Sequence, residues 1–101
     1  MYDMANLKKL GALGEGASKA MEAFWAFDKA ALADGAVPKK YKELIAIAVA
    51  LTTQCPYCLE LHKTAAVTAG ATQEEIAETA MVVAALRAGA AVTHATHVIG
   101  G

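Results

Sequence analysis

The sequence predicts an all-α protein, a compact single domain of four to six helices that spans residues 1–101. Hydrophobic residues make up 56% of the chain, and much of this content is alanine, which favours helix. Residues that cap or break helices divide the chain into segments of helical length. Only residues 44–51 have enough β-branched side chains to suggest a strand, and no second candidate strand exists to pair with them. We therefore interpret that segment as helix too.

The first third of the chain is expected to hold one short and one long helix. Met4 to Leu10 has the pattern of a short helix, but glycines at positions 11, 14 and 16 interrupt any longer one. Residues from about 17 to 33 form the long helix, which Asp34-Gly35 ends. We expect its large apolar side chains in the core or in a subunit interface, and they are Met21, Phe24, Trp25, Phe27 and Leu32.

The middle of the chain predicts two helices joined by a short connection. Pro38 marks the start of the first helix, whose residues 44–51 are apolar on every side and are therefore expected to be buried all round. Residues 52–54 form the connection. The second helix starts at Pro56, because proline fits a first turn where its missing N–H costs nothing, and it runs to about Ala69.

The last third predicts a capped helix followed by a separate helical stretch. Thr72 and Glu75 have the spacing of a capping box, in which each side chain bonds the backbone N–H of the other residue. We expect a break or kink at Arg87-Ala88-Gly89 and a final helical stretch over residues 90–98. His94 and His97 in that stretch are interpreted as surface or interface residues.

Charge and hydropathy exclude several classes of partner. The net charge is −1, so nothing indicates a nucleic acid or an anionic membrane surface as partner. No signal peptide is visible, and the longest uncharged apolar run, residues 44–51, is too short to span a bilayer. We therefore expect a cytoplasmic protein. Because so short a chain is so rich in alanine and other apolar residues, we also expect a homo-oligomer.

Two cysteines and a histidine form the most informative pattern in the chain. Cys55 lies at or next to the start of a helix, and Cys58 and His62 follow at i+3 and i+7, on the same helix face. A helix N-terminus favours a thiolate, and this spacing allows the two sulfurs to form a disulfide. One sulfur can then attack a substrate while the other resolves the product, and His62 can accept or return the proton.

Glu43 is a further candidate, although its spacing allows two interpretations. If the two middle helices pack as a hairpin, Glu43 could face the side of the second helix that carries the cysteines and His62. There it could act as a part-buried base with a raised pKa. Alternatively, it pairs with Lys39 or Lys40 on its own helix. Spacing alone favours the ion pair.

Together, Glu43, Cys55, Cys58 and His62 resemble the Glu-x11-Cys-x2-Cys-x3-His pattern of AhpD-like alkylhydroperoxidases, within the carboxymuconolactone decarboxylase superfamily. The resemblance covers about residues 23–97. It implies a helical hairpin that carries the Cys-x-x-Cys, and trimers or hexamers. It also implies that Cys58 attacks an organic hydroperoxide, that Cys55 resolves the product, and that Glu43 and His62 relay protons. An external dithiol would reduce the disulfide, and no tightly bound cofactor or metal is implied.

Tyr57 departs from that pattern, because members of the best-studied kind carry histidine directly before the second cysteine. Tyrosine is a poor base near pH 7, so we expect weaker peroxidase activity or a different substrate, with Tyr57 placed to line the mouth of the substrate pocket. Decarboxylase members generally lack the cysteine pair, which disfavours a carboxymuconolactone decarboxylase-type lyase. Zinc bound by Cys55, Cys58 and His62, and a redox-sensing oligomer, remain the alternative readings of the same residues.

Overall fold

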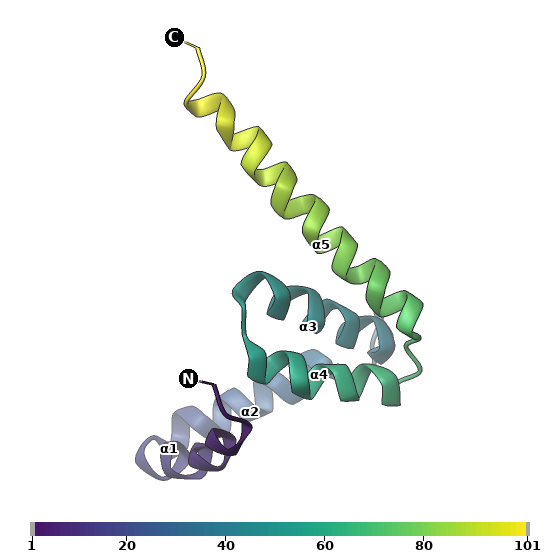
Figure 1. Cartoon of the computed structure of the whole chain (residues 1–101). Helices are drawn as coiled ribbons and strands as arrows, with labels where there is room; N and C mark the ends of the chain where they lie inside the picture. The colour runs from purple at the N-terminus through teal and green to yellow at the C-terminus, as the bar shows by residue number, and fades with distance from the viewer. Residues whose placement is uncertain (1, 101) are drawn as a thin grey trace.

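The computed structural model describes residues 2–100, and helices with short connections make up this part of the chain, with no strand in it (Figure 1). The order of the helices is η1 (Met4–Lys9), α1 (Leu10–Gly16), α2 (Ser18–Leu32), α3 (Lys39–Thr53), α4 (Pro56–Thr68), α5 (Gln73–His94) and η2 (Ala95–His97), where η marks a 3-10 helix. The prediction of an all-α protein with four to six helices is therefore confirmed. The predicted bounds of α2, α3 and α4 agree with the structure to within two residues.

A hairpin of α3 and α4 forms the centre of the fold (Figure 1). Gln54 ends α3 in the left-handed region, with φ of 57°, and this conformation reverses the chain between the two helices. The backbone N–H of Cys55 then donates to the carbonyl of Ala50, at 3.1 Å. The hairpin therefore places the first cysteine at the start of α4, as the family resemblance implied.

The core is small and lies where the hairpin meets the start of α5. Its buried members come from α3, α4 and the connection to α5, and they are Leu44, Ile47, Ala66 and Ala71. Leu51, Leu59 and Ile76 pack against this cluster. Alanine at position 66 leaves no exposed surface and lets the backbones of the hairpin helices approach closely.

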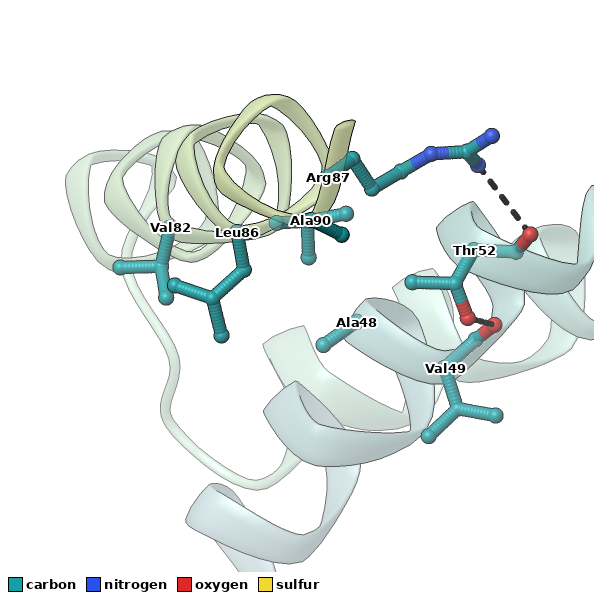
Figure 2. A pocket seen from close by; sticks show the side chains of 8 residues that line it. Ala48, Val49, Thr52, Val82, Leu86, Arg87 and Ala90 are labelled. Atoms are coloured by element: carbon teal, nitrogen blue, oxygen red, sulfur yellow. Dashed lines mark hydrogen bonds between the residues drawn. The ribbon is translucent and has the colours of Figure 1, made fainter. Parts of the chain in front are cut away.

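Two polar contacts connect helix α5 to α3, and the far part of α5 projects away from the hairpin (Figure 1). Near its start, Glu75 Oε2 pairs with Lys40 Nζ at 2.9 Å. Further along, Arg87 Nη1 donates to the carbonyl of Thr52 at 3.1 Å, at the end of α3 (Figure 2). Between these points lies an open groove of about 340 Å³, the α3–α5 groove, lined by apolar side chains that include Val82 and Leu86.

Two predictions about helix continuity are wrong. Helix α5 runs without a break through Gly89, because a single glycine lowers helix stability by only about 1 kcal/mol relative to alanine. Residues 10–16 form α1 in spite of their glycines. Together, α5 and η2 form a helical segment, Gln73–His97, that is long and apolar enough to cross a membrane by length and composition alone. The expected break at Gly89 would have divided this segment into two shorter helices.

The predicted burial of the apolar helices is only partly correct. Ile45 and Val49 of α3 are each 54% exposed, so α3 is not buried all round within a single chain. On α2, Phe24, Trp25 and Phe27 are also exposed and contribute no buried side chain to the core. An apolar helix predicts burial but does not say whether the same chain or another one covers it.

The capping box at the start of α5 provides a test of this fold. Thr72 Oγ1 accepts from the N–H of Glu75 at 3.0 Å, and Glu75 Oε1 accepts from the N–H of Thr72 at 2.9 Å. We expect Thr72→Ala to lower the free energy of unfolding by about 1 kcal/mol in chemical denaturation. Thr68→Ala, at an exposed position ending α4, is the control and should change it by less than about 0.5 kcal/mol. Equal effects would contradict the cap.

Candidate functional site

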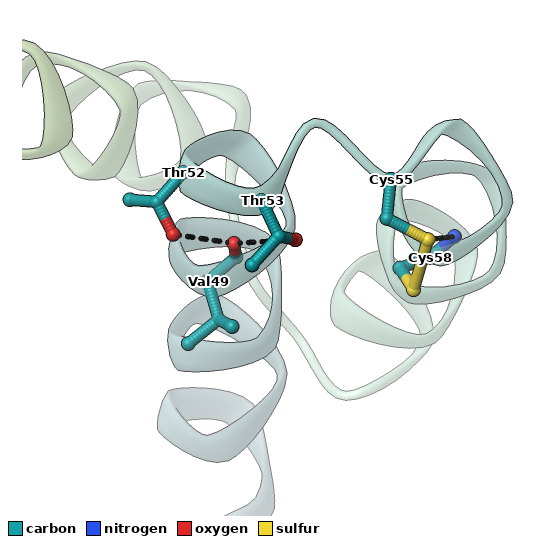
Figure 3. Close-up of a disulfide and its surroundings, with 5 residues drawn as sticks. All are labelled: Val49, Thr52, Thr53, Cys55 and Cys58. Carbon is teal, nitrogen blue, oxygen red and sulfur yellow. Dashed lines mark hydrogen bonds between the residues drawn. A yellow bond between two sulfur atoms is a disulfide. The ribbon is translucent and has the colours of Figure 1, made fainter.

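The two cysteines form a disulfide at the N-terminal end of α4 (Figure 3). The Cα atoms of Cys55 and Cys58 lie 5.4 Å apart, within the usual range for a disulfide. Cys55 occupies the N-cap position and Pro56 the first helical turn, as the sequence predicted. The spacing of three residues therefore does bring both sulfurs together on one helix face.

Cys55 also acts as the cap of the helix. Its Sγ accepts a hydrogen bond from the backbone N–H of Cys58 at 3.2 Å (Figure 3). No acidic residue lies in the first turn of α4, so nothing there opposes a negative charge on sulfur. Because the free N–H groups at a helix N-terminus stabilise an anion, this position favours the thiolate of Cys55 whenever the disulfide is open.

Glu43 lies at the centre of a three-residue network that joins α3 to α4. Its carboxylate is only 2% exposed, and Oε2 lies 2.6 Å from Nδ1 of His62. The other oxygen, Oε1, accepts from Lys39 Nζ at 3.1 Å. From the sequence, a lysine partner and a position facing the cysteines and His62 were alternatives for Glu43. In the structure both occur, because Oε1 pairs with Lys39 and Oε2 contacts His62. Lys40, the other candidate partner, pairs with Glu75 instead.

The expected rise in the pKa of Glu43 is wrong. Burial by itself raises the pKa, because it disfavours the charged carboxylate. The hydrogen bonds from His62 and Lys39 favour the carboxylate and together outweigh burial, so the pKa of Glu43 lies below its ordinary value of 4.5. At neutral pH Glu43 is therefore an ionised acceptor that orients His62, rather than a base of its own.

An open cavity of about 540 Å³ adjoins the disulfide, and we call it the α2–α4 cavity. Residues of α2, α3 and α4 line it, among them Leu32, Ala46, Val49, Cys58 and His62. Cys58 and His62 stand one turn apart on α4 and both face this space. Of the four residues singled out in the sequence, Glu43 therefore contacts His62, His62 and Cys58 line the same cavity, and Cys55 is bonded to Cys58.

Tyr57 lies elsewhere than expected. Its hydroxyl accepts a hydrogen bond from Asn6 Nδ2 at 3.1 Å and lies 3.4 Å from the backbone N–H of Asp3. Its ring packs edge-on against Tyr2, with 5.3 Å between ring centroids. The side chain therefore anchors the N-terminal segment and is not among the residues that line the α2–α4 cavity.

The structure also bears on the zinc alternative and on the two C-terminal histidines. Among residues 2–100, no three histidine, cysteine, aspartate or glutamate side chains come together in a way that could hold a metal ion. His94 and His97 are exposed at the far end of α5 and in η2, with 5.8 Å between their ring centroids.

Two residues near the site were not predicted from the sequence to belong to it. Lys39 donates to Glu43 and also to the carbonyl of Leu32 at 3.2 Å, so it links the end of α2 to the buried carboxylate. Asp28 of α2 lines the α2–α4 cavity beside the site. The i,i+4 spacing indicated the Lys39 pair, but no sequence signal indicates which face of α2 meets α3 and α4.

Comparisons with known proteins place these features in context. A family model described as the carboxymuconolactone decarboxylase family matches residues 18–99. A crystal structure of an apo protein of that family from Legionella pneumophila superposes with a TM-score of 0.76 at 34% identity, covering 89% of this chain and 80% of that one. The match therefore includes both the hairpin and α5.

Relatives among curated proteins are described as uncharacterised. "Uncharacterized protein 4 in cox locus" of Paracoccus denitrificans is 50% identical over 99 residues, 94% of this chain and 88% of that protein. An uncharacterised protein of Cupriavidus necator is 42% identical over 71 residues, which are 70% of this chain and 63% of the relative. These likenesses identify relatives without naming a reaction.

The ionised Glu43 predicts a pH dependence of stability. Because its pKa is lower in the folded chain than the ordinary 4.5, the carboxylate stabilises the fold above about pH 4.5, and this stabilisation is lost as the pH falls through the folded-state pKa. We expect Glu43→Gln to lower the free energy of unfolding by about 1–3 kcal/mol at pH 7 and by less at pH 3.

Chemical denaturation at several pH values measures this difference. Glu60→Gln is the matched control, because Glu60 is 45% exposed and pairs with Lys63 on the surface, at 3.4 Å. It should change the free energy of unfolding by less than about 0.5 kcal/mol at either pH. An effect of Glu43→Gln that is as large at pH 3 as at pH 7 would contradict the ionised network.

Proposed function

The chain belongs to the carboxymuconolactone decarboxylase family, and from this premise we propose that it is a thiol-dependent peroxidase or disulfide oxidoreductase that reduces organic hydroperoxides. The observation that carries the proposal is the contact of 2.6 Å between Glu43 and His62, beside a cavity that His62 shares with Cys58. The contact orients His62 as a base, and the shared cavity places this base near a cysteine pair that can be oxidised and reduced. A lyase reaction would have no use for the Cys55–Cys58 disulfide.

His62 is the proposed proton acceptor. Since an ionised carboxylate accepts but cannot donate, Nδ1 of His62 carries the hydrogen that bonds Glu43. Neutral His62 therefore keeps its lone pair on Nε2, the nitrogen available to a thiol in the cavity. Glu43 also stabilises the imidazolium that forms when His62 takes the proton of Cys58.

In the first step, the thiolate of Cys58 attacks the terminal oxygen of a hydroperoxide. The O–O bond breaks, sulfur loses two electrons, and the alkoxide leaves as the alcohol after taking a proton from His62. Cys58 becomes a sulfenic acid. The thiolate of Cys55 then attacks the sulfur of Cys58, and hydroxide leaves as water after protonation, which forms the disulfide. In sum, the hydroperoxide and two thiols yield an alcohol, water and one disulfide.

An external dithiol would complete the cycle. It attacks the disulfide, forms a mixed disulfide with one cysteine, and leaves as its own cyclic or internal disulfide after donating two electrons. Cys55 suits the leaving-group role, because its thiolate accepts the N–H of Cys58 at the helix N-terminus. This assigns the two cysteines different tasks, with Cys58 facing the substrate and Cys55 stabilised as the departing thiolate.

We further propose that the chain works as a homo-oligomer. Its accessible surface is 7445 Å², whereas a folded monomer of this mass exposes about 5,400 Å². Its radius of gyration is 17.1 Å, against about 13 Å for a compact chain of this length. The excess surface of about 2,000 Å² is of the size that obligate subunits bury against one another.

The apolar surface of α5 indicates where copies would pack. Met81, Val82, Leu86 and Val92 are each more than half exposed, and no α5 residue is fully buried. Packing against other copies in a trimer or hexamer would cover this surface in water, without a membrane.

The redox proposal predicts distinct outcomes for the two cysteines. With an organic hydroperoxide and excess dithiothreitol, we expect Cys58→Ser to abolish turnover. When it is first reduced and then freed of dithiothreitol, Cys55→Ser should consume about one equivalent of peroxide and retain a sulfenic acid, which dimedone labelling and mass spectrometry detect. Equal peroxide consumption by wild type and Cys58→Ser would refute the proposal.

The proton relay predicts slower formation of that sulfenic acid. We expect His62→Ala and Glu43→Gln each to slow it about 10²-fold or more in stopped-flow measurements at pH 7. His94→Ala, which alters an exposed histidine remote from the site, is the control and should leave the rate unchanged. Unchanged rates in His62→Ala would remove His62 from the mechanism.

The oligomer proposal predicts that a charge on α5 separates the subunits. We expect Leu86→Glu to reduce the mass measured by analytical ultracentrifugation toward that of one chain. Gln73→Glu places the same charge on the exposed first turn of α5 and should leave the mass unchanged. A monomeric wild type, or recovery of the wild type only in membranes, would contradict the proposal.

A further inference from the structure

Among the described residues 2–100, Asp28 is the one carboxylate in the wall of the α2–α4 cavity. It lies on α2 and is half-buried, while Cys58 and His62 enter the same cavity from α4. Within residues 2–100, the Asp28 side chain has neither a hydrogen-bond donor nor a lysine, arginine or histidine as partner. It therefore differs from Glu43, whose charge is held by His62 and Lys39.

The rest of the cavity wall offers Asp28 little compensation. Most of it is hydrocarbon from Phe27, Leu32, Ala46 and Val49. Thr53 also lines the cavity, but its hydroxyl already donates to the carbonyl of Val49, at 3.1 Å. Charges that face each other across a largely apolar cavity interact more strongly than they would in bulk water.

We propose that Asp28 determines substrate specificity by charge, an inference that rests on the proposed peroxidase function. The cavity would accept hydroperoxides whose organic group is apolar and either neutral or cationic, and would disfavour those that bring a carboxylate into the cavity. The apolar wall binds the organic group, and Asp28 repels an anion while Cys58 attacks the peroxide. Asp28 is thus a selecting residue, with no role in proton transfer.

The size of the effect follows from the dimensions of the cavity. A space of about 540 Å³ is of the order of 10 Å across, so a bound carboxylate lies within about that distance of Asp28. At the effective dielectric of a partly open site, repulsion over this range changes kcat/KM by about threefold to tenfold. Hydrogen peroxide has no organic group and should be indifferent to Asp28.

Three probes of one shape isolate the charge. They are cumene hydroperoxide, its para-carboxylate and its para-aminomethyl derivative, which are neutral, anionic and cationic at pH 7. For the wild type, we expect kcat/KM to be about threefold to tenfold lower for the anionic probe than for the neutral one, and highest for the cationic probe. In Asp28→Asn the three values should converge.

A matched control separates the cavity from the overall charge of the protein. Glu22→Gln removes one negative charge from an exposed position on the same helix, so it should keep the wild-type order of the probes. Asp28→Lys should invert that order, and a thermal melt checks that each variant is folded. If Glu22→Gln abolishes the discrimination as Asp28→Asn does, long-range charge explains it and the specificity role is overturned.

The two proposals fail in different ways. If the wild type consumes no hydroperoxide of any charge, the proposed function itself fails. If the wild type consumes all three probes at equal rates, and Asp28→Asn and Asp28→Lys do the same, the peroxidase function stands and the role of Asp28 is refuted.

Discussion

The buried carboxylate of Glu43 is the constraint on which the rest of this structure depends. A carboxylate that is 2% exposed must be compensated, and its two oxygens require two donors from different directions. His62 supplies one from α4, and Lys39 supplies the other from the first turn of α3. Since Lys39 also donates to the carbonyl of Leu32 at the end of α2, contacts made through Glu43 and its lysine partner connect α2, α3 and α4.

The same arrangement explains how a small core supports a defined site. Few side chains are fully buried, so apolar packing alone would leave the ends of the helices loosely held. Polar contacts act at those ends. Arg87 bonds the last carbonyls of α3 just before the chain turns into Cys55, and the Lys40–Glu75 pair holds the other end of α5. Half-exposed contacts of this kind contribute little stability each, but these two connect α5 to both ends of α3.

Local signals in the sequence predicted most of the fold and the site. Proline at position 56, the Thr72 capping box and the cysteine spacing each depend on neighbours within one turn, and each is confirmed. Predictions that depend on packing were less successful. The face of α3 that stays exposed, the depressed pKa of Glu43 and the position of Asp28 all depend on how helices distant in sequence meet. No spacing rule contains that information.

Tyr57 shows how tertiary context changes the meaning of a departure from a family pattern. A histidine at this position would add a base beside Cys58, and tyrosine cannot replace it near pH 7. The phenol hydroxyl of Tyr57 instead accepts from Asn6 and its ring packs edge-on against Tyr2, so this position holds the N-terminal segment against the start of α4. With tyrosine at position 57, the imidazole that shares the cavity with Cys58 is that of His62, and this is the ring that the buried carboxylate orients.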